Sequence, residues 1–210
     1  MNIDNHIYFD VASTTPVDPS VAEVMHEINM SYFGNPSSIH QIGQKSHNLI
    51  EKSRKQLSLL LGCHPSELFF TSGGTESNNL VLQGFLKQGD HLITSSYEHP
   101  SILNVAKELE KDGIEVTYLK PNSNGTIYPE ILESSIQENT QLVSIMYLNN
   151  ELGTINPIED MGKICGSHDI PFHTDAVQYI GKGQINITDY NISTLSLGAH
   201  KFYGPKGIGA

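Results

Sequence analysis

The sequence predicts an α/β fold with a mostly parallel sheet flanked by helices, and three observations carry that prediction. Short runs rich in β-branched and aromatic residues alternate with longer segments whose apolar residues recur at helical spacing. Short turns at Gly113 and Asn124-Gly125 separate neighbouring segments. Polar loops follow the predicted strands, where open parallel sheets place their ligands. The alternation indicates parallel pairing, because a parallel strand needs a crossover long enough to hold a helix.

Two helices are predicted before the regular alternation begins. Asp18 followed by Pro19 is typical of an N-cap and a first helical position, so the first helix should run to about Tyr32. The second covers residues 41–61, and Gly62 is placed to end it. Its buried face is expected to hold Leu49, Ile50, Leu57, Leu60 and Leu61.

The remaining elements alternate regularly. The predicted strands cover residues 67–71, 91–94, 115–119, 142–147, 171–174 and 193–197. The predicted helices between them cover residues 75–87, 100–111, 129–138 and 158–167. The carboxyl ends of these strands should therefore share one edge of the sheet.

Composition and charge exclude several classes of protein. With 210 residues and 38% apolar side chains, the chain is long enough for one large domain. Its 23 acidic residues exceed its 12 basic ones, and no run of Lys or Arg offers a strip for nucleic acid. No apolar stretch has membrane-spanning length, and the first residues lack the basic region followed by an apolar one that a signal peptide needs, which favours the cytoplasm. Two cysteines outside any C-x-x-C spacing suit a reduced compartment.

Five polar loops follow predicted strands. They cover residues 72–76, 98–99, 149–151, 175–178 and 198–201. In the first of them, the backbone N–H groups and the helix dipole suit an anion, and a plain turn capped by Thr75 is the alternative. The loop matches neither G-x-G-x-x-G nor the P-loop pattern, which disfavours dinucleotides and nucleoside triphosphates. Because all five loops follow strands whose carboxyl ends share one edge of the sheet, they predict a single site.

Lys201 and Asp175 are the candidate reactive pair. Burial at an apolar sheet end lowers the pKa of a lysine and suits it to Schiff-base chemistry, and the alternative is a solvated surface lysine. A lysine in that linkage and an aspartate on the pyridine nitrogen are what pyridoxal 5'-phosphate (PLP) chemistry most needs, although Asp175 is also a possible helix cap. His99 suits ring stacking or proton transfer. A metal site from His173, Asp175 and His200 lacks a compact ligand motif, and no G-x-S-x-G elbow supports a serine hydrolase.

Seven ordered motifs span the chain. They cover residues 10–16, 34–40, 70–77, 98–99, 149–153, 173–178 and 200–207. Together they resemble class-V aminotransferase-like proteins of PLP fold type I, and most closely the cysteine desulfurases. The resemblance implies an incomplete PLP-binding large domain over residues 16–210. Residues 1–15 would pack on a small C-terminal domain that is absent from this sequence.

The resemblance also implies roles for the site residues. Lys201 would be the Schiff-base lysine, and Asp175 would pair with the pyridinium nitrogen. Gln178 would hydrogen-bond the ring's phenolic oxygen, and Asn150 would lie beside that oxygen and the substrate. His99 would stack on the ring and help to move protons. No metal ion is implied.

The phosphate end of the cofactor is implied at Gly74, Thr75 and His200. Many relatives carry Ser three residues before the lysine as a phosphate ligand, whereas this chain carries Gly198 there. One phosphate hydrogen bond is therefore expected to be lost, although the backbone N–H groups of Gly198 and Ala199 remain.

The implied function is that of the PLP-binding portion of a cysteine desulfurase, which converts L-cysteine to L-alanine and transfers sulfur to an enzyme cysteine for iron–sulfur cluster or thio-cofactor synthesis. A sulfur acceptor or scaffold protein and a homodimer at full length are implied partners. The family's nucleophilic cysteine is missing, Cys63 and Cys165 are expected to be small buried hydrophobes, and Arg54 is a poor carboxylate clamp. The isolated chain is thus expected to be inactive and marginally stable or associated. A selenocysteine lyase, an aminotransferase or an inactive interaction partner are the alternatives.

Overall fold

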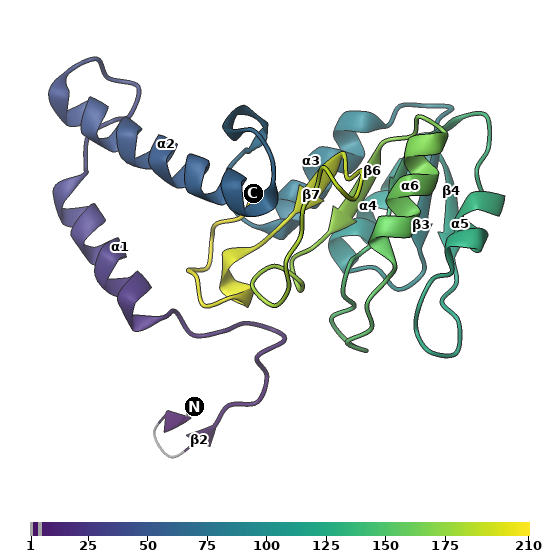
Figure 1. Ribbon diagram of the computed structural model, residues 1–210, viewed down its shortest axis with the longest axis horizontal. Coiled ribbons are helices and arrows are strands. Elements are labelled where there is room, and N and C mark those ends of the chain that lie inside the picture. Colours follow the sequence, from purple (N-terminus) through teal and green to yellow (C-terminus); the bar gives the residue numbers. More distant parts are fainter. Residues whose placement is uncertain (1, 4–5) are drawn as a thin grey trace.

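The computed structural model describes residues 2–3 and 6–210, and at its centre lies a parallel sheet with strand order β4-β3-β5-β6-β7 (Figure 1). The strands are β3 (His91–Ser95), β4 (Glu115–Leu119), β5 (Thr140–Ser144), β6 (Phe172–Asp175) and β7 (Thr194–Ser196). The helices around it are α3 (Gly74–Phe85), α4 (Pro100–Lys111), α5 (Pro129–Ser134) and α6 (Ile158–Ser167). The predicted α/β class with a mostly parallel sheet is confirmed.

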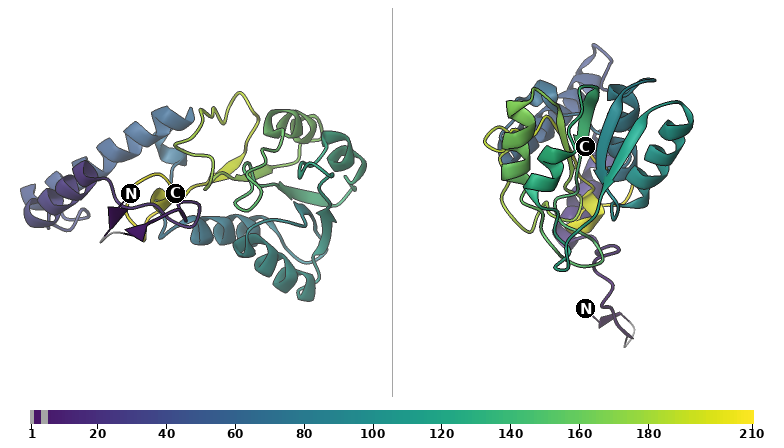
Figure 2. Two further views of the ribbon diagram at one scale, coloured as in Figure 1. Left: turned by 90° about the horizontal axis from the view of Figure 1, so that it is seen from below. Right: turned by 90° about the vertical axis from the view of Figure 1, so that its right-hand side faces the viewer.

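Helices cover both faces of the sheet, because successive strand residues point to opposite sides. Leu92 of β3 belongs to the core under α3 and α4, whereas the adjacent Ile93 belongs to the core under α5 and α6. Leu142 and Val143 of β5 divide in the same way. Figure 2 shows the two helical layers on either side of the strands. Both cores hold the strands rigidly, so their carboxyl ends keep a defined spacing.

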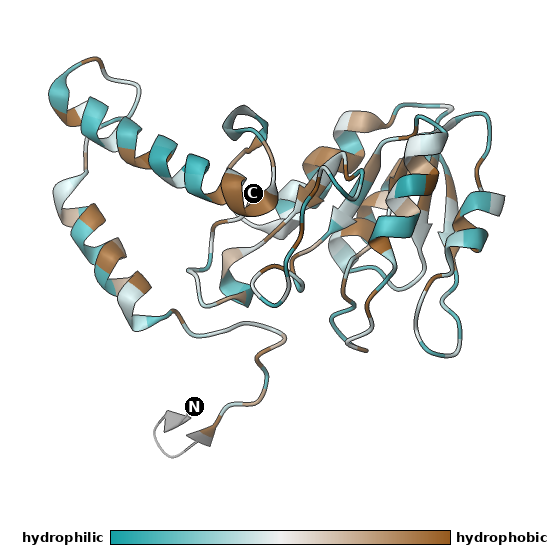
Figure 3. Ribbon diagram, viewed as in Figure 1, coloured by the Kyte–Doolittle hydropathy of each residue, from teal (hydrophilic) through white to brown (hydrophobic). Residues whose placement is uncertain are grey.

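The first two helices extend away from this body. Asp18 caps α1 (Pro19–Ser31) as predicted, and the left-handed Gly62 ends α2 (Gln41–Leu61). However, α1 buries no side chain, and its Val24, Met25 and Met30 are exposed. Figure 3 shows apolar residues along this helix, which extends away from the sheet. The predicted buried face of α2 is confirmed only toward the end of the helix, where Leu61 is buried and Leu57 packs half-buried against the core. It is wrong at Ile50 and at Leu60, which is 75% exposed. The reason is that α2 packs mainly on the short turn η1 (Pro65–Glu67) near its own end rather than on the sheet.

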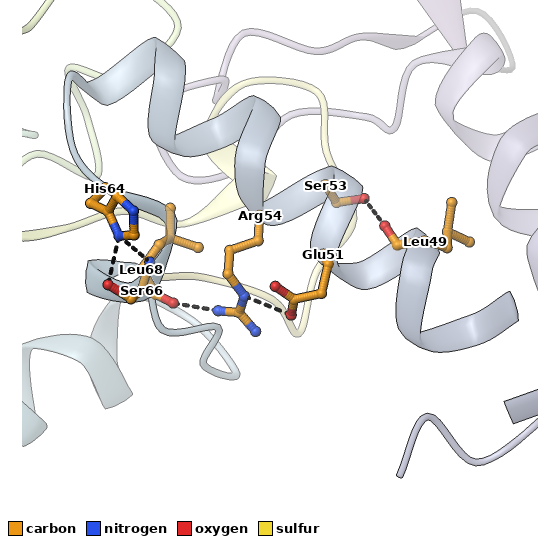
Figure 4. Close-up of polar contacts among 7 residues, drawn as sticks. All are labelled: Leu49, Glu51, Ser53, Arg54, His64, Ser66 and Leu68. Atoms are coloured by element: carbon orange, nitrogen blue, oxygen red, sulfur yellow. Dashed lines mark hydrogen bonds and ion pairs between the residues drawn. The ribbon is translucent and has the colours of Figure 1, made fainter. Parts of the chain in front are cut away.

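The strand predicted over residues 67–71 does not form. Only Thr71 pairs, through a single bridge to Gly209. The carbonyl oxygen of Leu68 accepts instead from the Arg54 guanidinium, whose Nε lies 3.0 Å from the Glu51 carboxylate (Figure 4). Arg54 thereby ties α2 to this segment. A mostly apolar groove of about 370 Å³ runs between this segment and β7, and none of the predicted site residues lines it.

Two further boundaries and one strand pair differ from the sequence prediction. The helix predicted over 129–138 ends at Ser134, because the hydroxyls of Ser134 and Ser135 donate to the carbonyl oxygen of Ile131. The strand predicted over 142–147 lies at Thr140–Ser144. A short antiparallel pair, β1 (Asn2–Ile3) and β2 (His6–Ile7), was not predicted.

The N-terminal segment lies against the loop that carries Lys201. The backbone N–H of Thr15 donates to the carbonyl oxygen of His200 at 2.8 Å, and Thr15 Oγ1 accepts from the N–H of Tyr203 at 2.7 Å. Residues 1, 4 and 5 of the predicted segment 1–15 lie outside the described residues. The division at residue 15 and the contact with a small domain stay predictions. No described helix combines the length and apolarity of a membrane span.

Candidate functional site

A pocket of about 230 Å³ opens at the carboxyl end of the sheet, where the loops after β3, β5, β6 and β7 meet the first turn of α3. Eight predicted cofactor residues line it: Gly74, Thr75, His99, Asn150, Asp175, Gln178, His200 and Lys201. The ninth, Gly198, lies beside it, since a Cβ on Gly198 would be 3.6 Å from the Gly74 nitrogen. The structure thus brings the five polar loops to one place.

Asp175 ends β6 and is buried beside this pocket. Its Oδ1 accepts from the N–H of Val177 at 3.0 Å, and its Oδ2 accepts from Asn78 Nδ2 at 2.7 Å. Burial raises the pKa of this carboxyl group, while the two hydrogen bonds and the nearby His99 and Lys201 oppose the rise. A cation held against Asp175 would stabilise its ionised form.

His99 is linked to Asp175 through two side chains that sequence reasoning missed. The N–H of Ser101 donates to His99 Nδ1 at 3.1 Å, so a neutral ring carries its proton on Nε2. Ser101 Oγ lies 2.8 Å from that Nδ1 and accepts from Asn78 Nδ2 at 2.9 Å. Asn78 lies one helical turn after Gly74 in α3, so helical spacing was a signal that could have placed it on the pocket face.

Lys201 is held by the N-terminal segment. Its Nζ donates to the carbonyl oxygens of Ala12 at 2.6 Å and Ser13 at 2.9 Å. Burial lowers the pKa of this amine, the Lys182 charge lowers it further, and Asp175 opposes the shift. Gln178 Nε2 donates to the same Ala12 oxygen at 2.8 Å. The amine is therefore easier to deprotonate than that of a solvated lysine, which suits attack on a carbonyl group.

The part of the pocket lined by the first turn of α3 suits an anion. The first turn of α3 starts at Gly74, where a Cβ would meet Val177 Cγ2 at 2.4 Å, so only glycine brings the backbone this close. The positive end of the helix dipole and the N–H groups of the first turn face that region. His200 lies there with its Nδ1 3.0 Å from Thr14 Oγ1, and burial lowers the pKa of its ring.

The chain is similar to known proteins over nearly its whole length. Residues 7–210 match the model of the family described as "Aminotransferase class-V". The chain belongs to this family. It is 47% identical to a mitosomal cysteine desulfurase from Encephalitozoon cuniculi, over 97% of this chain and 49% of that protein. It is 45% identical to the cysteine desulfurase IscS of Rickettsia typhi, over 100% of this chain and 52% of that protein.

Solved structures of class-V relatives have the same fold. A structure titled "SspA in complex with cysteine" superposes with a TM-score of 0.93 at 46% identity, over 97% of this chain and 60% of that one. A NifS-like protein superposes with a TM-score of 0.92 at 41% identity, over 97% of this chain and 57% of that one. The chain spans about half the length of the curated relatives it matches. The resemblance to cysteine desulfurases and the type I fold are confirmed.

Class-V aminotransferases use PLP, and the residues of this pocket fit that cofactor. The α3 terminus suits its phosphate, the Asp175 carboxylate suits its ring nitrogen, and the Lys201 amine suits its aldehyde. The buried Oδ1 of Asn78 has no hydrogen-bond partner among the described residues, and Asn78 lines this pocket beside Asp175. A buried acceptor without a donor is typical of a site completed by a bound molecule.

The two cysteines and His173, which the sequence also offered as reactive or metal-binding side chains, do not line the pocket. Cys165 is fully buried in α6, with its thiol pKa raised to about 12 by burial, whereas Cys63 is half-buried at the groove beside β7. Both nitrogens of His173 contact hydroxyls, on Ser144 and Ser196. Within the described ranges, no group of three His, Cys, Asp or Glu side chains is arranged to hold a metal.

Gly198 stands where many class-V relatives are expected to carry Ser as a phosphate ligand. Its backbone is extended, with φ −141° and ψ 120°, and a Cβ there makes ordinary contacts, so Gly198→Ser is sterically accepted. We expect the added hydroxyl to tighten PLP binding about tenfold, because a hydrogen bond to a charged group contributes about 1.5 kcal/mol. Absorbance titration with PLP measures the change. Gly198→Ala is the control for the methylene, and equal affinities of the two variants would contradict the prediction.

Proposed function

We propose that this chain is the PLP-binding part of a cysteine desulfurase. In that reaction the Cβ–S bond of L-cysteine breaks, a protein thiol takes up the sulfur as a persulfide, and L-alanine is left. The observation that carries the proposal is the convergence of Lys201, Asp175 and His99 on one pocket. The relatives named as cysteine desulfurases and the cysteine-bound solved structure support the substrate.

Each residue has a distinct task in this proposal. When bound, PLP supplies an electron sink next to the substrate amine. Asp175 keeps the ring nitrogen positively charged, and Gln178 and Asn150 orient the ring's phenolic oxygen and the substrate. His99 would lie against the ring and would move a proton at its Nε2, since its Nδ1 already accepts from the backbone N–H of Ser101. Lys201 supplies the amine that binds the cofactor.

The phosphate and the sulfur acceptor complete the proposal. Gly74, Thr75 and His200 hold the phosphate, with backbone help from Gly198. The acceptor thiol is neither Cys63 nor Cys165, because neither lines the pocket and burial raises the pKa of both. We further propose that a sulfur-acceptor or scaffold protein is a partner and that the protein is a homodimer at full length. We also propose that it is cytoplasmic and that the isolated chain is inactive. The mitosomal relative shows that location varies within the family.

Borohydride trapping tests the cofactor site. After incubation of the chain with PLP and reduction, we expect peptide mass mapping to find the adduct on Lys201. Lys201→Ala removes the adduct, and the exposed Lys111, replaced by Ala, is the matched control that keeps it. Labelling spread over many lysines, or retained in Lys201→Ala, contradicts the proposal.

Product analysis tests the substrate. With L-cysteine and a small thiol as sulfur acceptor, we expect the PLP-loaded chain to form L-alanine at most slowly. We expect fusion to the C-terminal half of the Rickettsia typhi relative, which this chain does not match, to accelerate the reaction. Exclusive reaction with L-selenocysteine indicates a selenocysteine lyase, and transfer of the amino group to a keto acid indicates an aminotransferase. Lys201 labelling without any product, even in that fusion, indicates an inactive interaction partner.

A further inference from the structure

Glu98 is a fully buried carboxyl group that joins two walls of the pocket. It lies between the end of β3 and His99, the N-cap of α4. Its Oε1 accepts from Ser95 Oγ at 2.5 Å and from the backbone N–H of Met146 at 2.9 Å. Met146 follows β5 and lines the pocket, as His99 does. One carboxyl oxygen therefore ties the loop of His99 to the end of the neighbouring strand.

The other oxygen of Glu98 is unpaired. Its Oε2 is buried without a hydrogen-bond partner among the described residues, and no cation forms an ion pair with this side chain there. Asp175, on β6, is the charged group that acts on it most directly, and Tyr97 and His99 flank it on its own loop. An ionised carboxylate buried beside another carboxylate, with one oxygen unpaired, is strongly disfavoured.

We propose that Glu98 is a positioning residue that carries a proton in the resting protein, so that it fixes His99 against β5 without placing a second negative charge beside Asp175. Its part in the reaction rests on the function proposed above, whereas its protonation does not. Burial raises the pKa of this group to about 8, and the Asp175 charge contributes to that rise. At neutral pH the acid form therefore predominates.

The neutral form matters because Asp175 has to be an anion to hold a positive ring nitrogen. A second negative charge at Glu98 would raise the pKa of Asp175 and favour its protonation. An ionised Oε2 would also have to be hydrated, and the entering water would loosen the link between His99 and Met146. A neutral carboxyl group provides the link and leaves the anion at Asp175.

Infrared spectroscopy of the cofactor-free chain tests the protonation. We expect a carbonyl stretching band of a protonated carboxyl group at neutral pH, lost on titration with a midpoint near pH 8. The band is absent in Glu98→Gln and unchanged in Glu130→Gln, whose carboxylate is on the exposed side of α5. Absence of the band in the wild type at neutral pH, or its persistence in Glu98→Gln, would overturn the proposal.

Urea unfolding provides a second readout. A carboxyl group with pKa 4.5 when unfolded and about 8 when folded binds more protons in the folded state between these values, so stability falls as pH rises through that window. We expect the wild type to lose stability relative to Glu98→Gln as the pH rises from about 4.5 to about 8. Parallel pH profiles of the two proteins contradict the proposal.

Lys201 trapping separates positioning from a purely structural role. Glu98→Ala, which loses the tie to Met146, is expected to slow adduct formation about tenfold, because small misplacements in a site are costly. Glu98→Gln keeps the Oε1 acceptor and is expected to restore the rate. Equal rates in Glu98→Ala and the wild type overturn the positioning role. If even the wild type is not labelled at Lys201, the proposed function fails, whereas the infrared band still decides the protonation of Glu98.

Discussion

Asp175→Asn is expected to weaken PLP binding at least 30-fold and, at the same time, to stabilise the cofactor-free chain. The binding loss follows because a buried charge partner of the ring nitrogen contributes about 2 kcal/mol or more, which is roughly 30-fold in affinity. The gain in stability follows because burial raises the pKa of Asp175, so the ionised carboxylate is costly in the folded chain. Asn is nearly the same shape and carries no charge.

Two measurements check this pair of opposite effects. Absorbance titration with PLP gives the affinity, and thermal unfolding without PLP at neutral pH gives the stability. Asp112→Asn, at the exposed end of α4, is the control and should change neither. A variant that loses affinity and stability together would show that Asp175 is a structural residue, because a group selected for binding a cation is expected to reduce stability.

Gly162→Ala is expected to destabilise the fold by about 3 kcal/mol, the upper range for overpacking a core. Gly162 lies in α6, and a Cβ there would stand 1.9 Å from the carbonyl oxygen of Tyr190. That atom belongs to the backbone, so relief requires α6 to move away from the loop before β7. Because α6 packs on β6, which ends at Asp175, the shift should also slow labelling of Lys201.

Gly166→Ala, one turn further along the same helix, is the matched control. A Cβ on Gly166 meets its nearest atom, in the Asn191 side chain, at 3.6 Å, an ordinary contact. This variant is expected to be unchanged or more stable by about 0.5 kcal/mol, since alanine favours the helix. Urea unfolding at equal slopes measures both variants. Comparable losses of stability in the two variants would show that the contact with Tyr190 does not cause the loss expected at Gly162.

Local patterns were enough for much of the fold. The limits of α2, α4, β4 and α6 follow from capping residues and apolar spacing, which act over a few neighbouring residues. The segment over residues 67–71 has the composition of a strand but pairs only at Thr71. Strand formation depends on partners elsewhere in the chain, and the Arg54 guanidinium takes the Leu68 carbonyl oxygen instead.

By itself the sequence determined the fold class and eight of the residues that line the pocket, because parallel strands direct their carboxyl ends to one edge and the motifs lie at those ends. Only the tertiary structure decided how those residues are held. The Asn78–Ser101–His99 chain, the contact of Lys201 with Ala12 and the buried carboxyl group of Glu98 each join segments far apart along the sequence. Their hydrogen bonds and burial arise from packing between elements, which no local pattern encodes.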